Sequence, residues 1–166
     1  MSRVNLRRLD QKPFIALADR ANRALQADLV RTQHRRGHPE IKPAHNSVFA
    51  TLAPDGSRAA DMAARAGITR QSMGEVIREM VDLGILEMRP DPEDRRAKLV
   101  TYTEHGVGVA SHGYDRLREL EQRFAEEFGE REYGMARDVL DRVAGLLDRW
   151  AAEELSTPDD QDTAAS

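Results

Sequence analysis

Two short helical segments followed by strand-like residues constrain the fold of this 166-residue chain more than any other feature. Residues 59–66 and 70–83 carry apolar side chains at helical spacing, and a glycine follows each segment. Thr69 is a suitable N-cap for the second segment, because its hydroxyl can accept a hydrogen bond from a first-turn amide. Ala63 and Gly67 supply the close crossing and the turn of a helix-turn-helix. The apolar positions expected to form its core are Met62, Ala66, Ile68, Met73, Val76, Ile77 and Met80.

After the second helical segment the pattern becomes that of a β-hairpin. Residues 85–89 and 98–103 are strand-like runs, and the loop between them is polar and contains two prolines. The loop and the start of the second run carry three basic residues, Arg95, Arg96 and Lys98. We expect Asp94 to accept hydrogen bonds from a neighbouring arginine or from loop amides and so to fix the loop. A hairpin placed directly after a helix-turn-helix predicts a DNA-binding wing; a solvated tip of mixed charge is the alternative.

The flanking segments are predicted to be helical. Apolar residues recur at three- and four-residue spacing over residues 10–36, 43–52, 104–128 and 130–154. The predicted fold class is mainly α with a small β-hairpin wing. It consists of a winged helix-turn-helix domain, residues 43–103, and a helical dimerisation region, residues 10–36 and 104–154. Residues 155–166 contain little to bury and are predicted to form a disordered acidic tail.

The flanking helices carry more apolar surface than a small winged-helix domain can cover. Burying one Leu or Phe side chain is worth about 1.5–3 kcal/mol, so several such residues left in water would be costly. Packing against a second copy of the chain removes this cost and predicts a homodimer, with Trp150 as an anchor of its core. A monomer folded back on itself is the alternative.

Charge is distributed unevenly along the chain. The net charge of −4 divides into +6 for residues 1–42, −1 for residues 43–103 and −9 for residues 104–166. DNA binding would therefore depend on individually placed arginines and not on bulk charge. The apolar runs are too short to span a bilayer and no signal peptide is visible, so we expect a cytoplasmic protein without a membrane partner.

The sequence offers little for catalysis. It has no glycine-rich phosphate loop, no nucleophile elbow and no cysteine, which also excludes disulfides and thiol redox switches. We predict that the chain is not an enzyme and needs no cofactor. His34 and His38 have a spacing that suits metal ligands, but Gly37 lies between them at an expected helix end. Surface or capping histidines and no metal site are therefore predicted; a metal sensor is the alternative.

From Ala59 to Gly106 the chain resembles the winged-helix domain of the MarR family of bacterial regulators. The resemblance is carried by the segment ADMAARAGITRQSMGEVIREMVDLGILEMRPDPEDRRAKLVTYTEHG, most specifically by its wing DPEDRRAK and its exit YTEHG. It implies a triangular homodimer with interleaved terminal helices and two helix-turn-helix units on a palindromic operator in double-stranded DNA. The implied function is a sequence-specific transcriptional regulator, in particular a ligand-responsive repressor. A winged helix that binds another protein instead of DNA is the alternative.

The resemblance also assigns roles to individual residues. It places one set of residues on or beside the groove-facing side of the second helix: Arg70, Gln71, Ser72, Gly74, Glu75 and Arg78. It makes Arg96 the wing-tip residue that enters the minor groove and Asp94 the structural partner of Arg96. It further implies a small phenolic or anionic effector between the winged domain and the dimer helices, and the side chains expected to line that crevice are Phe14, His45 and Phe49.

Two residues depart from the family pattern, in which a Ser/Thr-rich patch is commonly followed by a basic residue. Glu75 is unfavourable near phosphates unless it accepts from a cytosine amino group or pairs with Arg70 or Arg78. Gly74 costs about 1 kcal/mol of helix propensity relative to alanine. Close approach of the helix to the groove and a harmless packing glycine both account for Gly74.

Overall fold

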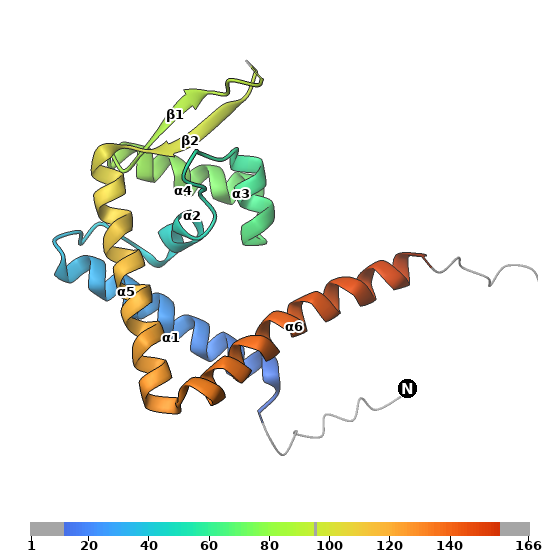
Figure 1. The fold of residues 1–166 in the computed structure, drawn as a ribbon. Helices are drawn as coiled ribbons and strands as arrows, with labels where there is room; N and C mark the ends of the chain where they lie inside the picture. The colour runs from blue at the N-terminus through green and yellow to red at the C-terminus, as the bar shows by residue number, and fades with distance from the viewer. Residues whose placement is uncertain (1–11, 95, 157–166) are drawn as a thin grey trace, which may run out of the picture. The chain divides into compact units, whose positions relative to one another are not determined.

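The computed structural model describes residues 12–94 and 96–156 and divides the chain into two compact units, with the boundary after Leu117. The first unit contains, in order, α1 (Phe14–Arg35), the 3₁₀ helix η1 (Pro43–His45), α2 (Asn46–Phe49), α3 (Ala59–Ala66), α4 (Arg70–Asp82), β1 (Leu86–Pro90), β2 (Lys98–Tyr102) and the start of α5 (Glu104–Phe128) (Figure 1). The second unit contains the end of α5 and α6 (Glu130–Ser156). The fold is mainly helical with one two-stranded hairpin, as predicted. Arg95 and residues 157–166 of the expected tail lie outside the described residues.

Local sequence signals determine most of the boundaries between these elements. Gly67 and Gly84 follow α3 and α4 with φ angles of 65° and 69°, a left-handed conformation that glycine adopts without strain. The Thr69 hydroxyl accepts a hydrogen bond from the Ser72 amide at 3.0 Å and caps α4. The segment expected as one helix over residues 43–52 begins instead as a 3₁₀ turn and becomes α-helical only from Asn46 to Phe49.

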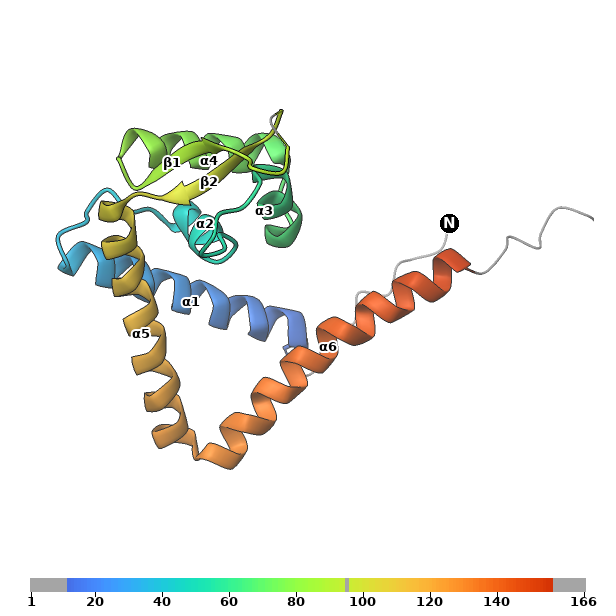
Figure 2. The same ribbon diagram turned by 45° about the horizontal axis from the view of Figure 1, so that its top comes forward.

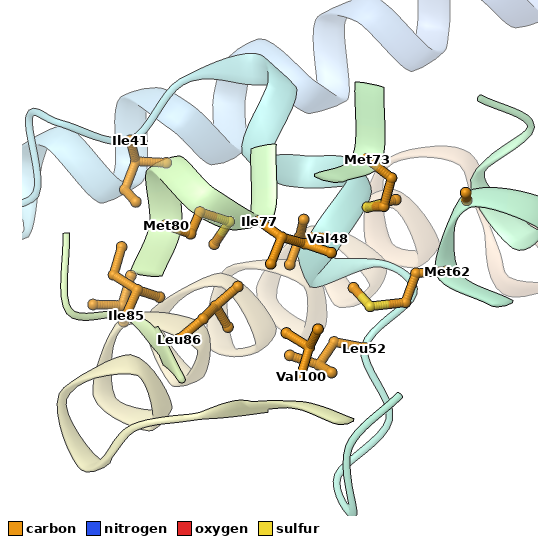
Figure 3. Close-up of a cluster of buried hydrophobic side chains, with 12 residues drawn as sticks. Ile41, Val48, Leu52, Met62, Met73, Ile77, Met80, Ile85, Leu86 and Val100 are labelled. Atoms are coloured by element: carbon orange, nitrogen blue, oxygen red, sulfur yellow. The ribbon is translucent and has the colours of Figure 1, made fainter. Parts of the chain in front are cut away.

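The core of the first unit lies between the helix-turn-helix and the hairpin (Figure 3). Its fully buried side chains include Val48 from α2, Met62 from α3, Ile77 from α4 and Val100 from β2. Ile68, expected in this core, is 37% exposed. It lies in the turn between α3 and α4, so it does not follow the helical period that turns its neighbours inward.

The hairpin is attached to the helices on both sides. Strands β1 and β2 pair antiparallel, with Leu86 opposite Tyr102 and Pro90 opposite Lys98. Figure 2 shows the hairpin beside α3 and α4. Ser57, just before α3, forms a further antiparallel bridge to Val100 through two backbone hydrogen bonds of 3.0 and 2.9 Å. The segment just before α3 therefore pairs with the outer edge of β2 through this one bridge.

The exit from the wing into α5 is also tightly packed. The Thr103 hydroxyl donates to the carbonyl of Gly84 at 2.6 Å and accepts from the amide of Gly106 at 2.9 Å. A β-carbon on Gly106 would lie 1.9 Å from the carbonyl oxygen of Ile85, so only glycine fits there. This contact explains why the exit motif has glycine at its end.

The second unit leaves much of its apolar surface in solvent. Phe124 of α5 contacts the rings of Phe128 and Tyr133, with centroid separations of 6.1 and 5.9 Å, around the turn at Gly129. Along α6 a set of large apolar side chains is about half exposed: Met135, Val139, Leu140, Leu147 and Trp150. Within the described residues, no helix is long and apolar enough to cross a membrane.

Candidate nucleic-acid interface

Helix α4 presents a polar face to solvent. Met73, Ile77 and Met80 are buried, and at 3.6 residues per turn the positions opposite them are Gln71, Glu75 and Arg78. The residues assigned to this face from the sequence are exposed, except that Gly74 is half-buried: Arg70, Gln71, Ser72, Gly74, Glu75 and Arg78. The fold therefore gathers the predicted set on one accessible helix surface.

The side chains of this face are held by contacts within α4. Ser72 Oγ lies 2.8 Å from the Thr69 hydroxyl at the N-cap. The side-chain amide of Gln71 donates to a carboxylate oxygen of Glu75 at 3.1 Å, one turn further along the helix. Glu75 therefore pairs with the side-chain amide of Gln71 and not with Arg70 or Arg78, the partners expected from the sequence.

Gly74 is not required by packing. A β-carbon added there would meet only Arg78 Nη1, at an ordinary contact distance of 3.6 Å. Alanine would therefore fit, and the explanation of Gly74 as a packing glycine has no support from the structure. Close approach of another molecule remains the explanation for an open position on this face.

The wing carries exposed cations on a loop with a defined conformation. Arg96 and Lys98 are exposed at its tip and at the start of β2. A carboxylate oxygen of Asp94 accepts from the Arg96 amide at 3.0 Å, and the Asp94 carbonyl accepts from the Ala97 amide at 2.9 Å. Asp94 thus organises the loop through backbone amides. Arg95, the third basic residue assigned to the wing, lies outside the described residues.

An ion pair between the partly exposed Arg58 and a buried carboxylate at the base of the wing was not foreseen from the sequence. Asp91 is only 5% exposed; one of its oxygens accepts from Arg58 Nε at 2.8 Å and the other accepts from the Glu93 amide at 2.9 Å. The amide of Glu93 and the guanidinium of Arg58 hold the pKa of the Asp91 carboxyl below its ordinary value. Arg58 thus ties the start of α3 to the wing loop, although the two residues are 33 positions apart and no local pattern connects them.

A second arginine joins the helix-turn-helix to the segment before it. Arg65 Nη2 donates to the Thr51 carbonyl at 2.7 Å and to the Ser57 hydroxyl at 2.9 Å. Beside Arg65 a cleft of about 340 Å³ opens between α1 and the α2–α3 region. Gln26 of α1 and Asn46 of α2 line this cleft, and the side-chain amide of Asn46 donates to the backbone carbonyl of Gln26 at 3.4 Å.

The three residues assigned to an effector crevice have different surroundings. His45 is fully buried: its Nδ1 accepts from the Lys42 amide at 3.3 Å and its Nε2 lies 3.4 Å from Glu79. Phe49 stacks on Tyr102 with ring centroids 6.3 Å apart. Phe14 is 49% exposed at the start of α1, about 18 Å along the helix from the turn of Gln26.

The histidines contact the backbone or one another within the first unit. His34 Nε2 is 2.8 Å from the Ile41 carbonyl, and the ring of His38 lies with its centroid 5.6 Å from those of His105 and His112. His45 is a capping histidine but not a surface one: its ring is fully buried, and its Nδ1 accepts from the Lys42 amide. Across residues 12–94 and 96–156, no group of three or more potential ligands is placed to hold a metal ion.

A helix-turn-helix followed directly by an antiparallel hairpin defines the chain as a winged helix-turn-helix protein. Residues 41–97 match the sequence model of the MarR family. This segment is therefore similar to the winged helix of the MarR family, and the chain as a whole has the fold seen in a MarR family transcription regulator. The matching family consists of transcription regulators and not of enzymes.

The chain is also similar to mycobacterial proteins. An uncharacterized protein of Mycobacterium tuberculosis is 29% identical over 113 residues, which cover 68% of this chain and 77% of the relative. An uncharacterized protein of Mycobacterium bovis matches to the same extent.

Solved structures share the fold at low sequence identity. A MarR family transcription regulator superimposes with a TM-score of 0.70 at 19% identity, over 84% of this chain and 91% of that chain. Wild-type MarR from E. coli, in its apo form, gives 0.63 at 18% identity, over 81% and 98%. The transcriptional repressor CouR, solved bound to a 23-mer DNA duplex, gives 0.58 at 21% identity, over 84% and 92%.

Proposed function

We propose that this protein is a cytoplasmic, homodimeric, sequence-specific DNA-binding regulator of transcription, in particular a ligand-responsive repressor. The observation that carries the proposal is the exposed polar face of α4 next to a wing with exposed cations. In this arrangement α4 enters the major groove, where Arg70, Gln71 and Arg78 meet base edges and phosphates. Arg96 of the wing enters the minor groove or contacts phosphates beside it.

Homodimerisation is supported by apolar surface that the chain leaves uncovered. Ile15 at the start of α1 is 76% exposed, and Leu147 and Trp150 of α6 are more than half exposed. Isolated exposed apolar residues are ordinary, but a stripe along a helix marks an interaction site. A two-fold dimer would set two α4 helices about 34 Å apart, one turn of DNA, and would match a palindromic operator.

Regulation by a small molecule follows from the same arrangement. A ligand changes DNA affinity only when it binds one spacing of the two winged domains better than the other. The cleft of about 340 Å³ beside Asn46 and Arg65 lies where α1 meets the winged domain. A compact phenolic or anionic molecule bound there would favour one angle between them. Phe14, His45 and Phe49, the side chains expected from the sequence to line an effector crevice, do not line this cleft, so the proposed effector would meet Gln26, Asn46 and Arg65 instead.

The experiment that tests DNA binding is a fluorescence anisotropy titration against genomic fragments at two or more salt concentrations. We expect an affinity that falls steeply with salt, because bound arginines release counterions from phosphates. Arg96→Ala should weaken binding about tenfold without dissociating the dimer. Arg123→Ala removes the same charge from α5 and should leave the affinity unchanged.

The same titration also tests the alternative function, a winged helix that binds another protein. If no duplex binds with salt-dependent affinity, and the α4 face instead retains a protein, the winged helix is a protein-interaction module. Equal affinity of the wild type and Arg96→Ala at moderate salt would separately remove the wing from the interface.

A further inference from the structure

Gln71 and Glu75 form a hydrogen-bonded pair in the middle of the exposed face of α4. Both side chains are accessible, and both lie opposite the buried Met73 and Ile77. The side-chain amide of Gln71 donates to one carboxylate oxygen at 3.1 Å, which favours one direction of the carboxylate. Whatever binds this face therefore meets a carboxylate, a group that only accepts hydrogen bonds.

The edges of the four bases differ in how they meet a fixed acceptor in the major groove. Guanine presents two acceptors, and thymine presents an acceptor and a methyl group, so neither offers a donor. Adenine offers an amino group but places the N7 acceptor beside it, where a carboxylate is repelled. Cytosine offers its N4 amino group without a neighbouring acceptor. A carboxylate on α4 consequently favours cytosine over the other three bases.

We propose that Glu75 is a specificity-determining residue that selects a cytosine in each half of the operator by accepting a hydrogen bond from its N4 amino group. The inference rests on the proposed function, which it deepens by naming a base. A carboxylate gains nothing from phosphates, since like charges repel, so Glu75 contributes discrimination and not general affinity.

Two neighbouring residues favour this role. At Gly74 a β-carbon would meet only Arg78 Nη1, at 3.6 Å, so the surface beside the pair is low and open to a base edge. Arg78 extends back over Gly74 and brings a guanidinium to the same turn of the helix. This cation offsets the repulsion between Glu75 and the phosphates, and its fork suits the two acceptors of a guanine.

The test is selection from a random duplex library with the full chain, for wild type, Glu75→Gln and Glu126→Gln. Glu126 is the matched control: it is exposed, and it accepts from Gln122 at 2.9 Å in the same i, i+4 arrangement on α5. Both substitutions remove one negative charge and keep a polar side chain. An amide can donate and accept, which suits the N6 and N7 of adenine.

We expect wild type and Glu126→Gln to select the same cytosine at two symmetric positions, and Glu75→Gln to select adenine there. On the selected duplex, replacing these C·G pairs by A·T should weaken wild-type binding about tenfold per half-site and strengthen binding of Glu75→Gln. Unchanged circular dichroism and dimer mass would show that Glu75→Gln is folded.

A cytosine preference that persists in Glu75→Gln, or its absence in wild type, would overturn the inference while leaving DNA binding intact. Failure of the wild type to select any duplex would overturn the proposed function and the inference together.

Discussion

The winged-helix core and helix α6 use the same kinds of side chain in opposite ways. Within the winged-helix domain, Met73, Ile77 and Met80 are almost fully enclosed by the chain's own helices and hairpin. On α6, Leu147 and Trp150 are more than half exposed, although they recur at the same helical spacing. The difference indicates that one chain suffices to enclose the core of the winged helix, whereas it leaves the apolar face of α6 uncovered, as the proposed dimer requires.

The largest expected effect comes from opening the enclosed core. Ile77→Ala should lower the free energy of unfolding by about 2–5 kcal/mol, because it removes buried methylene groups and leaves a cavity. Urea unfolding followed by circular dichroism measures this change. A loss below about 1 kcal/mol would contradict the description of Ile77 as a core residue.

The exposed stripe of α6 should respond differently. Trp150→Glu should leave the winged-helix domain folded but weaken self-association at least tenfold, since a charge would enter the apolar contact proposed between copies. Sedimentation at several protein concentrations measures this shift. Arg149→Glu adds a carboxylate at the adjacent position off the stripe and should change the dimer little. An unaltered dimer in Trp150→Glu would show that α6 is covered by something other than its counterpart.

A substitution at Gly74 should have opposite effects on the stability of the fold and on DNA binding. Gly74→Ala should stabilise the fold by about 0.5–1 kcal/mol, because alanine favours the helix and its β-carbon meets no close neighbour. The same change should weaken DNA binding if α4 approaches the groove closely at this point. Thermal unfolding and anisotropy titrations on one sample test both effects. A variant that is more stable and binds equally well would remove Gly74 from the interface.

The smallest expected effect concerns an ion pair between α1 and α5. Asp28 accepts from Arg116 Nε at 2.6 Å, and this hydrogen bond holds the pKa of the Asp28 carboxyl below its ordinary value. The pair therefore stabilises the fold above about pH 4 and is lost as the pH falls through the lowered pKa of the folded state. Urea unfolding between pH 2 and 6 should show a shallower acid dependence in Asp28→Asn. An identical slope in both proteins would mean that the pair contributes no net stability.

Features encoded by neighbouring residues could be predicted from the sequence. The bounds of α3 and α5, the Thr69 cap and the glycines after α3 and α4 depend on contacts within a few positions. Such signals are local, because a cap or a left-handed turn needs a particular residue type at one place. They account for most of the fold and for the exposure of the α4 face.

Contacts between distant segments could not be predicted. No sequence pattern around Asp91 predicts its pairing with Arg58. None around Asp28 predicts its pairing with Arg116, 88 positions away. Likewise, only the folded chain brings Glu79 of α4 to 3.4 Å from His45 Nε2. Side-chain pairs of this kind leave no periodic pattern in the sequence, so the ion pair at the base of the wing is evident only from the structure.

The bridge between Ser57 and Val100 limits how the hairpin and α3 can move relative to each other. The Arg58–Asp91 ion pair makes a second connection between the same two segments. The wing therefore cannot change its angle to α3 without breaking backbone hydrogen bonds and exposing the buried Asp91 carboxylate. The position of the hairpin relative to α3 is thus preset in each copy of the chain. Under the proposed function, a signal that alters operator affinity would have to shift this assembly as one block, by bending the chain where it leaves residues 57–103 and not within them.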